Sequence, residues 1–434
     1  MPVAPPSREP RERWHPVRRF FSNLGPGLIA GAADDDPSGI STFSVTGAAF
    51  GYAPLWTTLF TFPLMIAVQL MCARLGLVTG RGLGGMVRRT YPRSVLWTAC
   101  AILLVANTVN IAADLAGMGA SMQMITGVPS QIWTLVFTAV IVVLLFLSTY
   151  VTIARIFKWL TLVLFAYVIA AFFAHPDWHA VLVSTFVPHL EASARFFAVL
   201  VGIFGTSISP YLFFWQAAQE VEEERAMGRT TLAMRKGATP EELHGARNDV
   251  VTGMFVSQLV MYFIILTTAA TLHRHGVTEI ATARDAANAL RPLAGQFAYL
   301  LFTLGVVGAG MLAVPVLAGS SAYAIAEAGA WRGTLRDRPH ASPRFYLVIA
   351  VSMLLALALD FAGLDPVRSL FWSAVLNGVL APPLIVLVVL LTSNSKVMGE
   401  HVNPPILKWI GWFTALVMAV CTAAMFVTWA MGVS

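Results

Sequence analysis

Charged side chains are scarce in this sequence. Only 12% of its 434 residues are Asp, Glu, Lys or Arg, whereas 57% are hydrophobic. A soluble globular domain carries about 25% charged residues, so the composition excludes an ordinary soluble protein. The basic residues separate apolar runs and do not cluster in one polar region, which argues against a nucleic-acid-binding domain. We therefore expect a polytopic membrane protein with no nucleic-acid partner.

Cysteine and enzyme motifs are lacking as well. The three cysteines, Cys72, Cys100 and Cys421, each lie within an apolar run, which excludes a disulfide framework and a zinc site. The sequence contains no Walker loop, no GxSxG and no HExxH motif, the signatures of common nucleotide-dependent and hydrolytic enzymes. We predict that the chain is not an enzyme, has no catalytic residues and needs no cofactor.

Long apolar runs are what the sequence does have. A helix needs about 20 apolar residues to cross a bilayer. Eleven stretches meet or approach this length, and they cover residues 25–50, 54–80, 94–125, 131–150, 156–175, 195–219, 249–272, 297–326, 344–361, 367–392 and 406–432. We predict an all-α membrane protein with eleven transmembrane helices, of which the first is interrupted and the ninth is short.

Basic residues predict the orientation, because cytoplasmic loops carry an excess of Lys and Arg. With the N-terminus in the cytoplasm, eleven spans put most of the 28 Lys and Arg residues on the cytoplasmic side. The residues left outside are Arg195, Arg274, Arg284, Arg291 and Arg368. We expect a multi-pass protein of the cell (inner) membrane, with a cytoplasmic N-terminus and an external C-terminus.

The spans divide the chain into four parts. We expect a basic cytoplasmic tail over 1–20, a first block of five helices over 21–175, a second block over 195–392, and an eleventh helix over 404–434. The second block contains one charged cytoplasmic loop, 220–248, which we interpret as a solvated connector that stiffens the sixth span.

Three consecutive aspartates, Asp34, Asp35 and Asp36, interrupt the first apolar run just before Pro37. The nine residues that precede them would rise only about 14 Å as a helix, against a hydrocarbon core of about 30 Å. We therefore place the acids near the bilayer midplane, where they are costly and typical of a functional site. In an unwound segment Asp34 and Asp36 would share a side, so we expect Asp36 first and Asp34 second as cation ligands. A structural acidic turn without a ligand is the alternative.

The sixth span is interrupted in the same way, within the stretch 201–220. Its centre holds small, polar and helix-breaking residues, namely Gly205, Thr206, Ser207, Ser209 and Pro210. Two interrupted helices at corresponding places are typical of transporters built from inverted repeats, with the substrate site between the breaks. The five-span separation predicts two inverted five-helix repeats.

Four short motifs carry a resemblance to a known family. They are Gly25-Pro26-Gly27 followed by Asp36-Pro37, Gly205 with Pro210, "IAADLAG" at 111–117, and "TSNSKVMGE" at 392–400. In order and spacing they resemble the Nramp (natural resistance-associated macrophage protein) metal-ion transporters, and the chain looks like a divergent bacterial member. The resemblance implies a leucine-transporter-type fold and alternating access, with Asp36, Asp114 and the carbonyls of Ala33 and Thr206 at the site.

Several positions depart from the family pattern. The family's Asn ligand is replaced by Gly39, its Met ligand by Ser209, and the His that follows by Tyr211. A second His becomes Gln216, and an acidic residue in the third span becomes Gly117. Losing the thioether favours hard cations such as Mg²⁺ or Mn²⁺, because oxygen ligands suit them. Losing the His and Glu weakens the case for proton coupling.

A second hypothesis is a Na⁺-coupled symporter of a small solute or an oxyanion such as bicarbonate. The adjacent hydroxyls of Ser320 and Ser321 resemble a sodium site of related transporters, although small-residue helix packing explains them equally well. Asp114, Tyr211 and Asn377 are candidates for coupling or gating, and Asp114 and Asn377 could equally form structural hydrogen bonds. On either hypothesis the expected partners are the transported ion and the lipid bilayer, with no obligate protein partner.

Overall fold

The computed structural model describes residues 25–147, 162–363 and 365–432, and every regular element in these ranges is helical. The longer helices are α2 (Pro26–Asp34), α3 (Pro37–Phe50), α4 (Trp56–Thr79), α5 (Leu83–Thr90), α6 (Arg93–Thr126), α7 (Ser130–Leu147), α9 (Phe165–Phe173), α10 (Trp178–Phe186), α11 (Ala194–Ser207), α12 (Pro210–Ala226), α14 (Pro240–Thr271), α17 (Ala298–Gly329), α18 (Pro343–Phe361), α19 (Pro366–Thr392) and α21 (Pro405–Ala430). The shorter ones are α13 (Leu232–Arg235), α15 (Ala283–Ala287), α16 (Arg291–Ala294) and α20 (Ser395–Met398).

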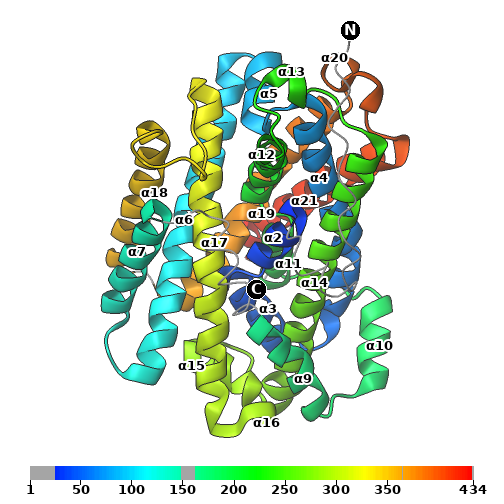
Figure 1. Ribbon diagram of the computed structural model, residues 1–434. Helices are drawn as coiled ribbons and strands as arrows, with labels where there is room; N and C mark the ends of the chain where they lie inside the picture. Colours follow the sequence, from blue (N-terminus) through cyan, green and yellow to red (C-terminus); the bar gives the residue numbers. More distant parts are fainter. Residues whose placement is uncertain (1–24, 148–161, 364, 433–434) are drawn as a thin grey trace, which may run out of the picture.

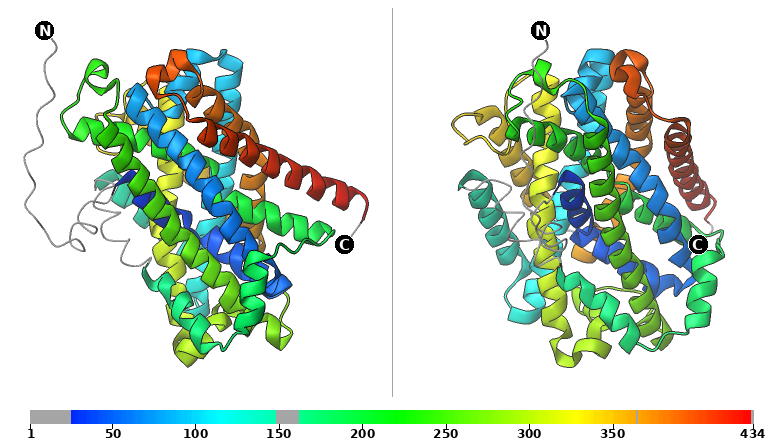
Figure 2. Two further views of the ribbon diagram at one scale, coloured as in Figure 1. Left: turned by 90° about the vertical axis from the view of Figure 1, so that its right-hand side faces the viewer. Right: turned by 45° about the vertical axis from the view of Figure 1, so that its right-hand side comes forward.

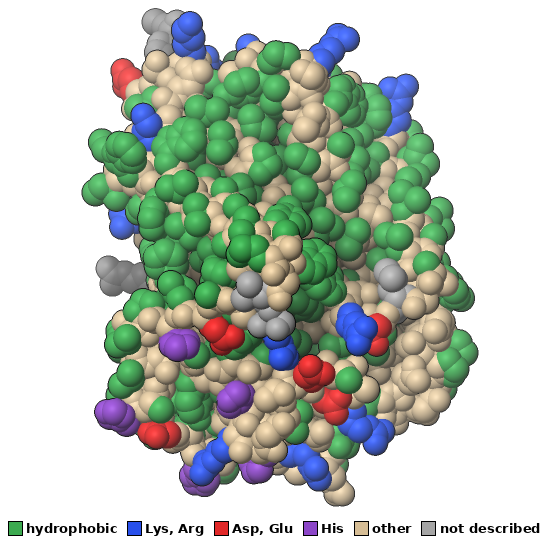
Figure 3. All heavy atoms as spheres, turned by 180° about the vertical axis from the view of Figure 1, so that it is seen from behind, with side chains coloured by type: hydrophobic (Ala, Val, Ile, Leu, Met, Phe, Trp, Pro, Cys, Tyr) green, Lys and Arg blue, Asp and Glu red, His purple; other side chains and the backbone are tan. Residues whose placement is uncertain are grey.

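The described helices have the length and surface of a membrane bundle. Nine helical segments in the described ranges are long and apolar enough to cross a bilayer. The predicted first span is not among them because it is split into α2 and α3, and of the predicted fifth span only the end is described, as α9. Hydrophobic side chains cover the middle of the molecule, while charged and His side chains gather toward its ends (Figure 3). The prediction of an all-helical polytopic membrane protein is confirmed.

Both predicted interruptions are present in the structure. Helix α2 ends at Asp34 and α3 begins at Pro37, while α11 ends at Ser207 and α12 begins at Pro210. In each case a proline occupies the first turn of the second half, where its missing N–H is tolerated and its fixed φ favours the helix. The two helices are therefore interrupted in the same way, by a proline that begins the second half.

The broken helix formed by α2 and α3 lies at the centre of the bundle (Figure 1). It packs against α14 on one side and against α6, α17 and α19 on the others. Helix α21 lies along the outside, against α11 and α19, as the turned views make clear (Figure 2). We call the end of the molecule that carries α5 and α13 the α13 end, and the opposite end, with α15 and α16, the α16 end (Figure 1).

Glycines allow these central helices to touch along their backbones. A Cβ atom added to Gly31 of α2 would lie 2.2 Å from the carbonyl oxygen of Gly253 in α14, and one added to Gly205 of α11 would lie 2.0 Å from that of Ala374 in α19. Close backbone contact at small residues is a common means of packing membrane helices. The two broken helices are thus each held tightly by one unbroken neighbour.

Much of the predicted loop 220–248 is helical. Helix α12 continues to Ala226, and α14 already begins at Pro240 behind a capping box formed by Thr239 and Glu242. Arg229 bridges the two helices through ion pairs with Glu224 and Glu242. The connector is therefore short and tied to both helices.

Candidate cation-binding site

Asp36 lies at the break between α2 and α3 and is 2% exposed. Its Oδ1 accepts hydrogen bonds from the Gly39 backbone and the Ser38 hydroxyl, both at 2.7 Å, and its Oδ2 accepts one from the Asn110 amide at 2.9 Å. The bond from Gly39 makes Asp36 the N-cap of α3, a position that favours Asp. Three donors compensate part of the cost of burying this carboxylate in a membrane.

Asp34 and Asp35 share a different neighbour, Ser257 of α14. Its hydroxyl lies 2.9 Å from Asp34 Oδ2 and 3.0 Å from Asp35 Oδ1. A hydroxyl has one proton to donate, so it cannot satisfy both carboxylates fully. The structure thus pairs Asp34 with Asp35, and not with Asp36 as an unwound segment would, because Asp34 still belongs to α2 and only Asp35 and Asp36 lie in the break.

Asp114 of α6 reaches the same break from the other side. It is fully buried, and its Oδ1 accepts the Ser38 backbone N–H at 3.2 Å. Asn110, one turn before Asp114 in α6, donates to Asp36. The amide of Asn377 in α19 donates in turn to Asn110 Oδ1 at 3.4 Å. Helices α3, α6 and α19 therefore meet in one polar network at the break.

The second break faces the first. A Cβ atom added to Gly39 would lie 2.8 Å from Thr206 Oγ1, so the two breaks approach closely. The Ser209 hydroxyl donates within its own helix, 2.8 Å from the carbonyls of Gly205 and of Thr206. The Tyr211 hydroxyl crosses to α2 and donates to the Ala33 carbonyl at 2.8 Å. Both predicted carbonyl ligands thus accept a hydroxyl, and each keeps a second lone pair free of that bond.

Ser320 and Ser321 of α17 contact α6. The Asn107 amide lies 2.8 Å and 2.9 Å from their hydroxyls and 2.9 Å from the Leu317 carbonyl. Both hydroxyls also donate to the Leu317 carbonyl, at 2.9 Å and 3.2 Å. Such bonds are typical of polar contacts between membrane helices.

The central acids leave two oxygens without partners. Asp34 Oδ1 and Asp114 Oδ2 are buried and have no hydrogen-bond partner in the structure as described. Among the described residues no three His, Cys, Asp or Glu side chains form a ready-made metal cluster. Buried acceptors without donors are rare in proteins. The break is therefore surrounded by carboxylate oxygens that lack partners, but these oxygens do not form a complete coordination shell.

Two residues of α14 that bind the ends of α2 were not predicted. Ser257 contacts the acidic break, and Asp249 accepts the backbone N–H groups of Gly27 at 2.6 Å and Leu28 at 3.3 Å. Asp249 thereby satisfies orphan donors at the N-terminus of α2 and opposes its helix dipole. Both residues could have been found as polar residues inside an apolar run, because Ser257 and Asp249 lie in the predicted span 249–272.

Comparison with known proteins fixes the family. The model of the family described as "Natural resistance-associated macrophage protein-like" matches residues 27–428, which is most of the chain. The chain belongs to the Nramp family. This is a family of transporters, so the expectation that the chain is not an enzyme is confirmed.

Relatives of this Nramp protein include the "Divalent metal cation transporter MntH" of Klebsiella pneumoniae, which is 27% identical over 400 residues, covering 90% of each chain. A crystal structure of the Eremococcus coleocola manganese transporter superposes with a TM-score of 0.76 at 16% identity, over 96% of this chain and 89% of that one. The crystal structure of MhsT in complex with L-phenylalanine superposes with a TM-score of 0.60 at 12% identity, over 93% of this chain and 98% of that one. These likenesses confirm the leucine-transporter-type fold.

Proposed function

We propose that this Nramp protein is a secondary transporter that moves a hard divalent cation, Mg²⁺ or Mn²⁺, across the membrane by alternating access. The observation that carries the proposal is the pair of buried, unpartnered carboxylate oxygens of Asp34 and Asp114 beside the capped carboxylate of Asp36. Buried carboxylates in a membrane protein mark ion pathways, and a cation supplies the partner that these oxygens lack. The names of the relatives support the same class of cargo.

The donor set supports a hard cation. Asp36, Asp34 and the carbonyls of Ala33 and Thr206 are all oxygen donors, and the side chains of Thr206 and Ser209 at the second break are hydroxyls. Mg²⁺ and Mn²⁺ prefer such ligands, whereas soft ions gain from thioether or thiolate sulfur. In this conformation the hydroxyls of Tyr211 and Ser209 contact the two carbonyls. We propose that they turn away when a cation binds, and that water completes the coordination shell.

The proposed transport cycle uses the two breaks. We infer eleven transmembrane helices arranged as two inverted five-helix repeats, with the N-terminus in the cytoplasm and the C-terminus outside. The unit formed by the two broken helices rocks against the helices that include α6, α7, α17 and α18. Asp114 and Asn377, which belong to α6 and α19, contact the break directly or through Asn110, so they are placed to sense whether the site is filled. Obligatory proton coupling is not part of the proposal, because Gly117 and Gln216 cannot carry protons.

The proposal is tested with purified protein in liposomes. Uptake is measured for Mg²⁺, Mn²⁺, Na⁺ and bicarbonate, with calorimetry on the same preparation and protein-free liposomes as the control. We expect saturable Mg²⁺ or Mn²⁺ uptake that needs neither Na⁺ nor a proton gradient. Sodium-dependent bicarbonate uptake without divalent-cation binding would overturn the proposal and favour the symporter hypothesis, for which Ser320 and Ser321 would be the sodium ligands.

A further inference from the structure

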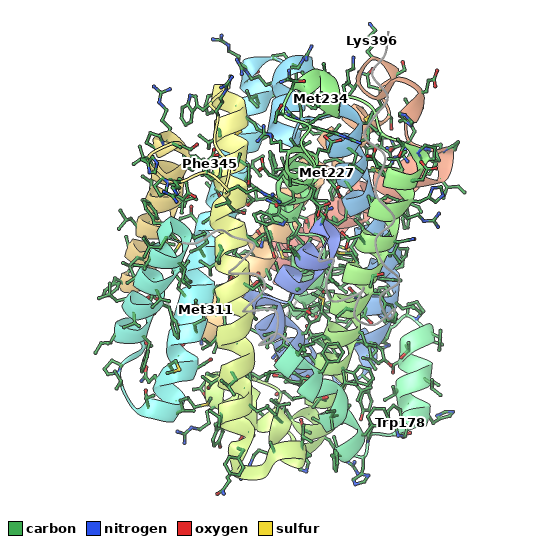
Figure 4. All side chains as sticks on the ribbon, in the orientation of Figure 1. Trp178, Met227, Met234, Met311, Phe345 and Lys396 are labelled. Carbon is green, nitrogen blue, oxygen red and sulfur yellow. The ribbon has the colours of Figure 1, made fainter. Side chains whose placement is uncertain are left out.

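A second cleft lies at the α13 end of the molecule, away from the acidic break. It has a volume of about 810 Å³ and opens between α12, α17 and the chain that follows α17. Figure 4 labels Met227 and Met234 on the α12 and α13 side of this end, and Phe345 at the start of α18. None of the four central aspartates lines the cleft. Its size is that of a small-molecule site.

Four arginines converge on this cleft, namely Arg225, Arg235, Arg332 and Arg336. Three acids also line it, and each already has a partner. Glu222 pairs with Arg225 at 2.6 Å, Glu327 accepts the Gly85 backbone N–H at 3.0 Å, and Asp337 accepts the Ser342 hydroxyl at 2.7 Å. Within the described part of the chain, the guanidinium groups of Arg332 and Arg336 donate no hydrogen bond and form no ion pair. The four arginines outnumber the three acids, so the lining carries an excess positive charge.

Arg235 is the least exposed of the four, with 7% of its surface accessible. Its Nη1 donates to the carbonyls of Arg229 and Thr230, both at 2.8 Å, but its Nε is buried without a partner. Burial, followed by the positive charge of Arg225, lowers the pKa of Arg235, and the negative charges of Glu224 and Glu222 offset only part of this shift. A buried donor left unsatisfied is costly. The positive-inside rule explains basic residues at this end but not a buried, unsatisfied one.

We propose that this cleft binds a phosphate-bearing anion through Arg235, Arg332 and Arg336. The planar guanidinium group of arginine can donate two parallel, charge-assisted hydrogen bonds to the oxygens of a phosphate. A bound anion would also balance the excess positive charge of the cleft. The positive lining repels the proposed cargo, so the cleft is a separate binding site and not an exit path for the cation. The phosphate comes either from a soluble phosphate compound or from the headgroup of an anionic lipid, since basic pockets at membrane helix ends take both.

The binding test uses the full chain and no transport assay, so its outcome is independent of the proposed cargo. Titration calorimetry in detergent measures the affinity of the protein for pyrophosphate and for ATP. In a second measurement, the melting temperature of the protein in phosphatidylglycerol nanodiscs is compared with that in phosphatidylcholine nanodiscs. The test variant is R332Q combined with R336Q, because both side chains are exposed and unpartnered. The matched control is R338Q, which is exposed in the same segment but does not line the cleft.

We expect the double variant to weaken anion binding by at least about tenfold, as expected for lost charge-assisted bonds, and R338Q to leave it unchanged. Loss of pyrophosphate or ATP binding identifies a soluble ligand. If phosphatidylglycerol raises the melting temperature of the wild-type protein but not that of the double variant, the ligand is a lipid headgroup. A wild-type protein that binds neither source, or that binds them no better than the double variant, overturns the proposal.

Discussion

The two breaks use the same backbone device and hold opposite chemistry. At each break two residues separate the end of one helix from the proline that begins the next. At the first break the N-cap Asp36 accepts the Gly39 N–H, and acids surround it. At the second break the N-cap Ser209 donates to carbonyls in the last turn of α11 and makes no side-chain capping bond to α12. The first break therefore supplies negative charge, while the second supplies hydroxyls that occupy its own acceptors.

This difference teaches that the backbone fixes where a site can form and the side chains fix what it can bind. Each break provides a backbone carbonyl as a possible ligand, that of Ala33 or that of Thr206. In the conformation seen here each of these carbonyls accepts a hydrogen bond from a hydroxyl. Three substitutions separate the contributions of the two breaks.

The largest effect is expected from Asp36→Asn. The amide keeps the N-cap role, which Asn fills as well as Asp, but it removes the charge. We expect cation affinity to fall by more than about 100-fold, since replacing even the residues that orient a metal ligand costs about 10- to 100-fold. Calorimetry and liposome uptake measure the loss, and an unchanged melting temperature confirms that the fold is intact. Normal uptake by this variant would remove Asp36 from the site.

An intermediate effect is expected from Ser209→Met, which restores a thioether at the second break. We expect the ratio of Cd²⁺ or Mn²⁺ uptake to Mg²⁺ uptake to rise about tenfold, equivalent to about 1.4 kcal/mol. Ser209 is 2% exposed, so the larger side chain also tests the available space. Ser209→Leu controls for size without sulfur. An equal change in both variants would mean that residue 209 is not a ligand position.

The smallest effect is expected from Tyr211→Phe, which deletes the hydroxyl that contacts the Ala33 carbonyl. Because a net hydrogen bond contributes about 1 kcal/mol, we expect cation affinity to rise about fivefold. Competition binding with Mn²⁺ measures the change. Weaker binding in this variant would indicate that the Tyr211 hydroxyl contacts the cation itself.

The sequence predicted the positions of both breaks because prolines and polar residues act locally on the chain. Pro37 and Pro210 begin the second half of each broken helix, as their restricted φ requires. The spans followed from hydrophobic length alone. The roles of the individual site residues stay predictions, because neither the fold nor the family match tests them.

The partners of the central acids could not be predicted, because they come from distant parts of the chain. Ser257 and Asp34 are 223 residues apart, and Asn110 and Asp36 are 74 apart. The rotation of α14 and α6 about their own axes decides which polar residue meets which carboxylate. That rotation depends on glycine contacts such as Gly31 with Gly253, which a single sequence does not pair.

The contact of α2 with α14 has a consequence for motion. Helix α2 is a rod of about 14 Å that joins the rest of the bundle through two residues, and its close contact with α14 is backbone against backbone at Gly27, Gly31 and Gly253. Small residues on both sides of this contact let α2 tilt on α14 without separating bulky side chains, and the tilt would break the hydrogen bonds of Tyr211 to Ala33 and of Ser257 to Asp34. Asp249 accepts two backbone N–H groups at the far end of α2, so we expect loss of this carboxylate to weaken the attachment of that end of α2 to α14.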